Sequence, residues 1–263
     1  MTPRPPDSLP KPKPTESRQP SRPSLKVLAW NLERRKPTTP RGVEGIDYLF
    51  GHAPDIMALC ETRTTFPVRD GYLLTGDAST PARYGDDERK MAIWSATELE
   101  PVEFDSGIDR TRFVAARTET SIGTVLILAI CIPWHMAEVT YHEGVKRRPW
   151  ELHHSYLEHL NTIIRDAIIR NIDGPVVIAG DFNQRYPRVK GGNIAAAQAL
   201  ESTFQPFDIV TAGIPKGCNR PGIDHIALSP HLHATDVGGW PNDVGGKRLS
   251  DHDGVWATVG RSL

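Results

Sequence analysis

The chain has 263 residues, with 31 lysines and arginines, 32 aspartates and glutamates, and a formal net charge of −1. This length allows one large domain or two small ones, and the near-neutral charge argues against a protein that coats nucleic acid by charge alone. No stretch approaches the roughly 18 uncharged apolar residues that a membrane helix needs, so we expect no membrane partner.

The first 24 residues differ in composition from the rest. They hold eight prolines, five basic and two acidic residues, and a single leucine. Such a segment buries too little apolar surface to offset the entropy cost of ordering. We therefore expect a disordered, basic, proline-rich tail over residues 1–24 and a single domain over residues 25–263. Three cysteines without a CxxC pair and the lack of a secretion signal indicate a cytoplasmic protein, which we expect to be a monomer.

Hydrophobic periodicity predicts the following elements in chain order. Strands are expected at 25–30, 55–60, 71–75, 91–96, 111–118, 123–132, 175–179, 223–228 and 254–259, and helices at 43–52, 150–171 and 194–201. The glycine-rich segment 229–250 is expected to be a loop. Runs of adjacent strands on each side of one long helix favour two stacked sheets with helices outside.

Polar side chains lie at the ends of these apolar strands at five places. They are Asn31, Glu61, Asp181 with Asn183, Asp224, and Asp251 with His252. Carboxylate and amide oxygens bind Mg²⁺ or Mn²⁺ and leave positions for water and phosphate. A further carboxylate can activate water, and a histidine held by a carboxylate can bind a phosphate oxygen. The set indicates phosphoryl chemistry.

Five ordered motifs carry a resemblance to a known family. AWN at 29–31, LCETR at 59–63, IAGDFN at 178–183, GIDHI at 222–226 and LSDH at 249–252 resemble those of the endonuclease/exonuclease/phosphatase superfamily. The resemblance implies an α+β fold, a four-layer α/β/β/α sandwich of two mixed, mainly antiparallel sheets. It also implies a phosphoesterase that depends on Mg²⁺ or Mn²⁺.

The resemblance also implies roles for individual residues. Glu61 would be the main metal ligand, completed by Asn31 and Asp251. Asp181 would activate water or protonate the leaving oxygen, and Asn183 would orient the phosphate. Asp224 and His252 would form a carboxylate–histidine pair.

One motif is irregular, because many family members place a His or Tyr at the end of the strand before the long helix. His135 is our candidate for this phosphate contact, although alignment through Pro133 puts Cys131 there instead.

Five more residues are predicted to bind substrate, with a plain surface role left open for each. They are Arg34, Arg35, Arg63, Arg185 and Trp240. Guanidinium groups bind phosphate through two parallel hydrogen bonds, and an exposed indole can stack a base.

The leading functional prediction is a nuclease that cleaves nucleic-acid phosphodiesters. The alternative is a phosphatase of inositol phosphates, phosphoinositides or nucleotides, since DFNQR at 181–185 resembles the Asp-x-Asn-x-Arg of inositol 5-phosphatases. That group usually has Arg after the later Asp, where this chain has His225. A third alternative is a catalytically silent scaffold that recruits partners through the proline-rich tail.

Overall fold

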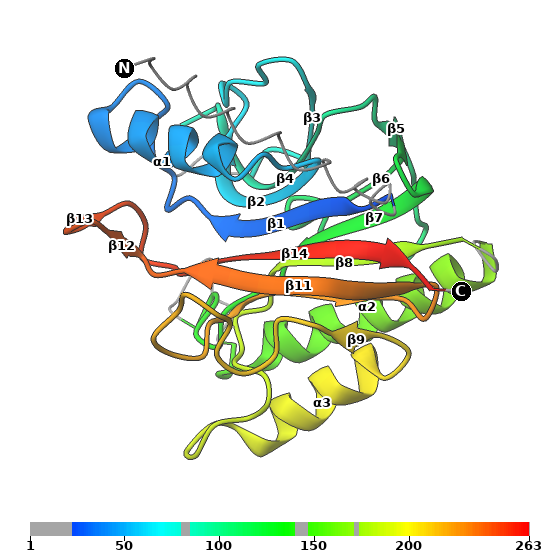
Figure 1. Ribbon diagram of the computed structural model, residues 1–263. Helices are drawn as coiled ribbons and strands as arrows, with labels where there is room; N and C mark the ends of the chain where they lie inside the picture. The colour runs from blue at the N-terminus through cyan, green and yellow to red at the C-terminus, as the bar shows by residue number, and fades with distance from the viewer. Residues whose placement is uncertain (1–22, 80–84, 140–146, 171–173, 263) are drawn as a thin grey trace, which may run out of the picture.

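The structure is a computed structural model that describes residues 23–79, 85–139, 147–170 and 174–262. The predicted tail lies outside this described part up to residue 22. Two six-stranded sheets stack face to face (Figure 1). The first has the order β11-β14-β1-β2-β4-β3 and the second the order β5-β6-β7-β8-β10-β9.

The first sheet contains β1 (Leu25–Asn31), β2 (Ile56–Arg63), β3 (Tyr72–Thr75), β4 (Glu88–Ser95), β11 (Leu232–Trp240) and β14 (Gly254–Arg261). The second contains β5 (Glu100–Pro101), β6 (Phe113–Thr120), β7 (Gly123–Cys131), β8 (Val176–Asp181), β9 (Asp208–Ile209) and β10 (Asp224–Leu228). The pairs β1–β2 and β7–β8 are parallel, and the other pairs are antiparallel.

The three helices of the described residues lie on the outer faces of the sheets (Figure 1). Helix α1 (Pro40–Gly51) packs Ile46 and Leu49 on the first sheet. Helices α2 (Glu151–Arg170) and α3 (Ile194–Phe204) pack on the second sheet. Alternate strand residues, such as Val27 and Ile127, fill the core between the sheets. The predicted four-layer sandwich is confirmed.

The expected loop over residues 229–250 is wrong in its first half. Residues 232–240 form the edge strand β11, and a small hairpin follows, made of β12 (Asp243–Val244) and β13 (Lys247–Arg248). Two features conceal the strand in the sequence. A register shift between Ala234 and Asp236 breaks the alternation of side chains, and Gly238 and Gly239 contribute no side chain to it.

The topology brings the ends of several strands to one end of the sandwich. The parallel strands β1 and β2 finish there, as do β7 and β8. Because β10 and β14 run antiparallel to β8 and β1, they begin where those strands finish. The polar residues that follow or precede these strands therefore gather at one edge. Among the described helices, none is long and apolar enough to cross a membrane.

Gly180 is required by a close approach of two strands directly before Asp181. It has a φ of +139°, and a Cβ atom there would lie 2.0 Å from the carbonyl oxygen of Ile130 on β7. We expect Gly180→Ala to lower the free energy of unfolding by about 3 kcal/mol. Urea denaturation measures this loss.

The matched control for Gly180 is Gly51→Ala, where an added Cβ meets no atom within 4 Å. Its free energy of unfolding should change by no more than about 1 kcal/mol. Equal urea midpoints for the two variants would contradict the claim that Gly180 is sterically required.

Candidate active site

Asp181 is buried at the last residue of β8 and is held by two amide side chains. Its Oδ2 accepts hydrogen bonds from Asn31 Nδ2 at 3.2 Å and from Asn183 Nδ2 at 3.1 Å. Its Oδ1 accepts from the backbone N–H of Asn183 at 2.8 Å. Asn183 also donates to the carbonyl of Ile132 at 2.8 Å. The carboxylate therefore has a fixed orientation.

A carboxylate–histidine pair lies beside Asp181. The distance from His252 Nδ1 to Asp224 Oδ2 is 2.6 Å, and the His252 side chain is 13% exposed while that of Asp224 is buried. Asp224 Oδ1 is buried without a hydrogen-bond partner among the described residues. The predicted pairing of these two side chains is present.

The segment that carries His252 is fastened to the end of β1. Trp30 Nε1 donates to the His252 carbonyl at 2.9 Å. The Ser250 hydroxyl donates to the carbonyl of Asn31 at 2.5 Å and accepts from the backbone N–H of His252 at 3.2 Å. Ser250 therefore positions two site residues.

The charges of the site set the protonation of its two central groups. Burial by itself lowers the pKa of His252, but the carboxylate of Asp224 outweighs this and, with Asp181 and Asp251, raises the pKa to about 11. Burial raises the pKa of Asp181, the charge of Asp224 raises it further, and it reaches about 7. His252 is thus a cation at neutral pH, and Asp181 can take up or release a proton there.

Two sets of side chains at the site offer ligand atoms for a metal ion. Ligand atoms of Asp181, Asp224 and His252 lie within 4.8 Å of one another. However, both ring nitrogens of a cationic histidine carry protons, so His252 has no lone pair for a metal. Glu61 and Asp251 offer carboxylate oxygens, which suit a hard divalent cation.

Glu61 lies close to the other carboxylates of the site. Its pKa is raised by burial first, against the opposing charge of Arg34, and the charges of Asp181 and Asp251 add to the rise. Asp251 is 45% exposed, and its Oδ1 is 4.0 Å from His252 Nε2. Three carboxylates therefore face one region, which fits a divalent cation.

Asn31 is already engaged in hydrogen bonds inside the protein. Its Nδ2 donates to Asp181, and its Oδ1 accepts from the backbone N–H of Glu33 at 2.9 Å. In this structure Asn31 positions Asp181, and its predicted role as a metal ligand stays a prediction.

The arginines predicted to bind substrate are mostly paired with acids. Arg34 forms ion pairs with Glu61 and, at 3.2 Å, with Glu88. The guanidinium of Arg63 is 2.5 Å from Asp87, and that of Arg35 is 2.6 Å from Glu33. Arg185 is exposed and donates to the carbonyl of Pro221 at 3.2 Å.

The prediction that Trp240 stacks a base is wrong. Trp240 is 2% exposed, and its ring packs on Trp30, Tyr48 and His52 beneath α1. The reason is the strand β11, which ends at Trp240 and turns the indole into the core. The exposed tryptophan is Trp134, at 51%.

The structure places Cys131, and not His135, at the strand end beside Asp181. Cys131 is the last residue of β7 and is opposite Asp181 in the parallel register. His135 lies four residues further on, between the rings of Trp134 and Trp150, at 5.3 and 5.4 Å. Its contact with phosphate stays a prediction.

Sequence reasoning missed two cations near the site. Nη1 of the largely buried Arg112 donates to the Cys131 carbonyl at 3.3 Å, and Arg112 is close enough to Asp181 for their charges to interact. Lys90, on β4, has its pKa lowered by burial and then by the charge of Arg112. Each lies directly before an apolar run, Lys90 before Met91 and Arg112 before Phe113, which was the available signal.

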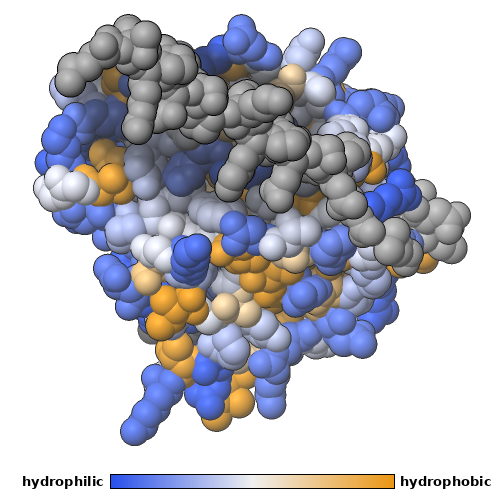
Figure 2. All heavy atoms as spheres, in the orientation of Figure 1, coloured by the Kyte–Doolittle hydropathy of each residue, from blue (hydrophilic) through white to orange (hydrophobic). Residues whose placement is uncertain are grey.

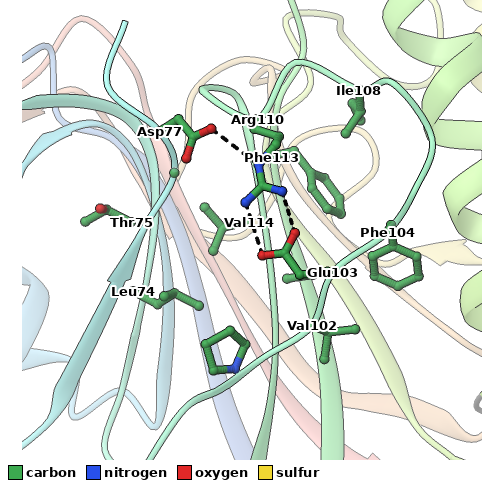
Figure 3. Close-up of a pocket in the computed structure, with 13 residues that line it drawn as sticks. Leu74, Thr75, Asp77, Val102, Glu103, Phe104, Ile108, Arg110, Phe113 and Val114 are labelled. Atoms are coloured by element: carbon green, nitrogen blue, oxygen red, sulfur yellow. Dashed lines mark hydrogen bonds and ion pairs between the residues drawn. The ribbon is translucent and has the colours of Figure 1, made fainter.

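A separate small cavity of about 70 Å³ lies between the end of β3 and the β5–β6 pair. Figure 3 shows its one arginine, Arg110, between Asp77 and Glu103. The distances are 3.3 Å to Asp77 and 2.6 Å to Glu103, so this guanidinium is neutralised. None of the predicted site residues lines this cavity.

Several solved structures share this fold. An endonuclease/exonuclease/phosphatase from Bacteroides vulgatus aligns with a TM-score of 0.64 and 14% identity, over 91% of this chain and 99% of that chain. The catalytic domain of human nocturnin with bound sulfate aligns with 0.61 and 15%, over 94% and 100%. The endonuclease domain of TRAS1, a telomere-specific non-LTR retrotransposon, aligns with 0.58 and 19%, over 90% and 99%.

At these identities the structural likeness shows the fold alone. A search of curated protein sequences finds no match. The sequence model of the Endonuclease/Exonuclease/phosphatase family matches residues 28–252, a span that runs from within β1 to His252 and includes Asn31, Glu61, Asp181, Asp224 and Asp251. The chain therefore belongs to the endonuclease/exonuclease/phosphatase family.

Proposed function

We propose that this protein is a divalent-metal-dependent nuclease that hydrolyses nucleic-acid phosphodiesters. The observation that carries the proposal is the buried Asp181, fixed by Asn31 and Asn183 beside the Asp224–His252 pair. The family includes nucleases and phosphatases, and its members typically hydrolyse phosphoester bonds.

Each residue of the candidate active site has a separate role in the proposed reaction. Asp181, with a pKa of about 7, takes a proton from the attacking water or gives one to the leaving oxygen. The His252 cation holds a non-bridging phosphate oxygen, and Asn183 orients the phosphate. Glu61, with Asp251 and Asn31, would hold Mg²⁺ or Mn²⁺, which offsets negative charge on the phosphate.

The exposure and position of Trp134 support the proposal that the substrate contains bases. Trp134 is exposed and follows Ile132 by two residues, and the carbonyl of Ile132 accepts a hydrogen bond from Asn183. Because Trp134 is only two residues from a segment that contacts Asn183, its aromatic face suits stacking of a base next to the reacting phosphate.

The phosphoinositide alternative has less support. The position after Asp224, where inositol 5-phosphatases usually carry Arg, is occupied by the buried His225. Its ring contacts the Thr211 hydroxyl at 3.3 Å and the Gln184 carbonyl at 3.1 Å. This position therefore offers no cation to a substrate.

A substrate panel tests the proposal. The panel holds single-stranded DNA, RNA, plasmid DNA, a base-free methyl nitrophenyl phosphodiester, mononucleotides and inositol phosphates, each with Mg²⁺, Mn²⁺ or excess chelator. We expect chelator to abolish cleavage. Trp134→Ala should lower kcat/KM for the best oligonucleotide by about tenfold and affect the base-free diester much less.

The control for the panel is Ile169→Ala, which removes another exposed apolar side chain, on α2. It should leave the preference between the oligonucleotide and the base-free diester unchanged. Hydrolysis that persists in excess chelator, or that is confined to inositol phosphates, would refute the nuclease proposal.

A further inference from the structure

A basic cavity of about 510 Å³ lies beside the candidate active site and is open to solvent. The loop between β1 and α1, the first turn of α1 and the end of β2 form its walls. Five of its lining residues are cationic and one is acidic: Arg34, Arg35, Lys36, Arg41 and Arg63, with Glu33. On the face shown in Figure 2, hydrophobic residues form separate patches among hydrophilic ones.

The charges of this basic cavity are not balanced. Arg35 is paired with Glu33, and the acids that pair with Arg34 and Arg63 lie outside the lining. Lys36 and Arg41 are exposed, and no carboxylate in the described ranges pairs with either of them. Two cations therefore remain for an anionic ligand.

The first turn of α1 adds to the positive potential. Thr39, the N-cap residue, and the first helical residues Pro40 and Arg41 line the cavity. The N-terminus of a helix carries a partial positive charge and attracts phosphate. In this cavity it acts together with the side-chain cations.

The wall of the cavity is already built in the structure. The backbone N–H and the hydroxyl of Thr39 both donate to the Lys36 carbonyl, at 3.0 and 2.9 Å. That carbonyl would lie 2.0 Å from a Cβ atom at position 42, so Gly42 allows the loop to pack tightly on the helix. Lys36 and Arg41 are thus held on a defined frame.

Arg34 connects the cavity with the active site. Its guanidinium lines the cavity and pairs with Glu61, and its backbone N–H donates to the Glu61 carbonyl at 2.8 Å. A ligand that occupies the cavity therefore lies next to Glu61 and the candidate active site. A polynucleotide strand offers such a ligand, because each nucleotide adds one phosphate.

We propose that this cavity binds the phosphodiester that flanks the scissile one in a single strand of nucleic acid. Lys36 and Arg41 make the contact, and the N-terminus of α1 supports it. The inference rests on the proposed nuclease function and specifies how a strand, as opposed to an isolated phosphate ester, is recognised.

Binding of labelled single-stranded DNA oligonucleotides tests the proposal, with fluorescence anisotropy as the readout and chelator present to prevent cleavage. The double variant Lys36→Ala/Arg41→Ala should bind a ten-nucleotide strand about tenfold more weakly at low salt. The slope of log affinity against log salt should fall by about 0.7, because the contact with one phosphate of a single strand is lost. Affinity for a dinucleotide, which has no flanking phosphodiester, should change less than twofold.

A charge-matched control is Arg165→Ala/Arg261→Ala, which removes two exposed cations from α2 and from the far end of β14. It should retain the wild-type affinity and salt slope. The reversal Lys36→Glu/Arg41→Glu should weaken binding further, and circular dichroism verifies that each variant is folded.

The outcomes separate this inference from the proposed function. If the wild-type protein cleaves the strand but the Lys36→Ala/Arg41→Ala variant binds it like the control, the cavity is not the flanking-phosphate site and the nuclease function stands. If that variant weakens the dinucleotide as much as the ten-nucleotide strand, the cavity holds the scissile phosphate and the inference fails. A wild-type protein that neither binds nor cleaves nucleic acid overturns both.

Discussion

Glu61→Gln is expected to lower phosphodiester hydrolysis by at least about 10²-fold, because the amide keeps the shape of the side chain and loses its charge. Glu61 interacts with the charges of Asp181 and Asp251, and under the proposed function its substitution removes the main anionic ligand of the metal. Initial rates measured across a Mg²⁺ titration give the effect on turnover.

A second readout for Glu61 does not depend on activity. Mn²⁺ binding, measured by calorimetry or by the increase in thermal stability that it causes, should weaken strongly in Glu61→Gln. The control is Glu103→Gln, since Glu103 lies in the small cavity beside Arg110 and not in the active site. Wild-type rates and wild-type Mn²⁺ affinity in Glu61→Gln would show that Glu61 is no metal ligand.

Removal of the Asp224–His252 pair is the second large effect. His252→Ala should lower turnover by about 10²–10⁴-fold, because it removes a fixed cation from the phosphate in the transition state. Asp224→Asn should also be damaging, since Asp224 Oδ2 is 2.6 Å from His252 Nδ1 and its charge keeps the ring cationic. An amide there can present the wrong hydrogen-bonding group to the ring.

The two losses should be far from additive, because the residues act as one unit. The double variant should be about as slow as the slower single variant, and apparent Mg²⁺ affinity should change much less than in Glu61→Gln. His233→Ala, which removes an exposed histidine from β11, is the control. A double variant that loses the product of the single losses would show that Asp224 and His252 act independently.

Local sequence was sufficient to predict the layers and several of the polar residues that the structure brings together at one edge. Each apolar strand has a readable period, and Asn31, Asp181 and Asp224 lie directly at strand ends. Once the sheets stack, parallel and antiparallel pairing must bring those ends to one edge. The family resemblance predicted the same set in chain order, and the family match over residues 28–252 confirms that membership.

Side-chain environments depend on contacts between segments that are distant in sequence. For this reason the prediction for Trp240 was wrong, and Arg112 was not predicted at all. Trp240 was expected at the surface, but β11 pairs with β14 and turns its indole under α1. The strand was hidden because a bulge and two glycines interrupt its alternation. Arg112 was missed because its proximity to Asp181 depends on a neighbouring strand.

The sequence by itself determined most of the strands, the polar residues at their ends and the family. Only the tertiary structure determined which of those residues form hydrogen bonds and ion pairs with one another, and how their pKa values are shifted. His252 and Asp224, whose Nδ1 and Oδ2 atoms are in contact, are 28 residues apart in the sequence. Asn31 and Asp181, which share a hydrogen bond, are 150 residues apart. Burial and the charge of a distant partner set a pKa, and neither is encoded in the residues next to the group along the chain.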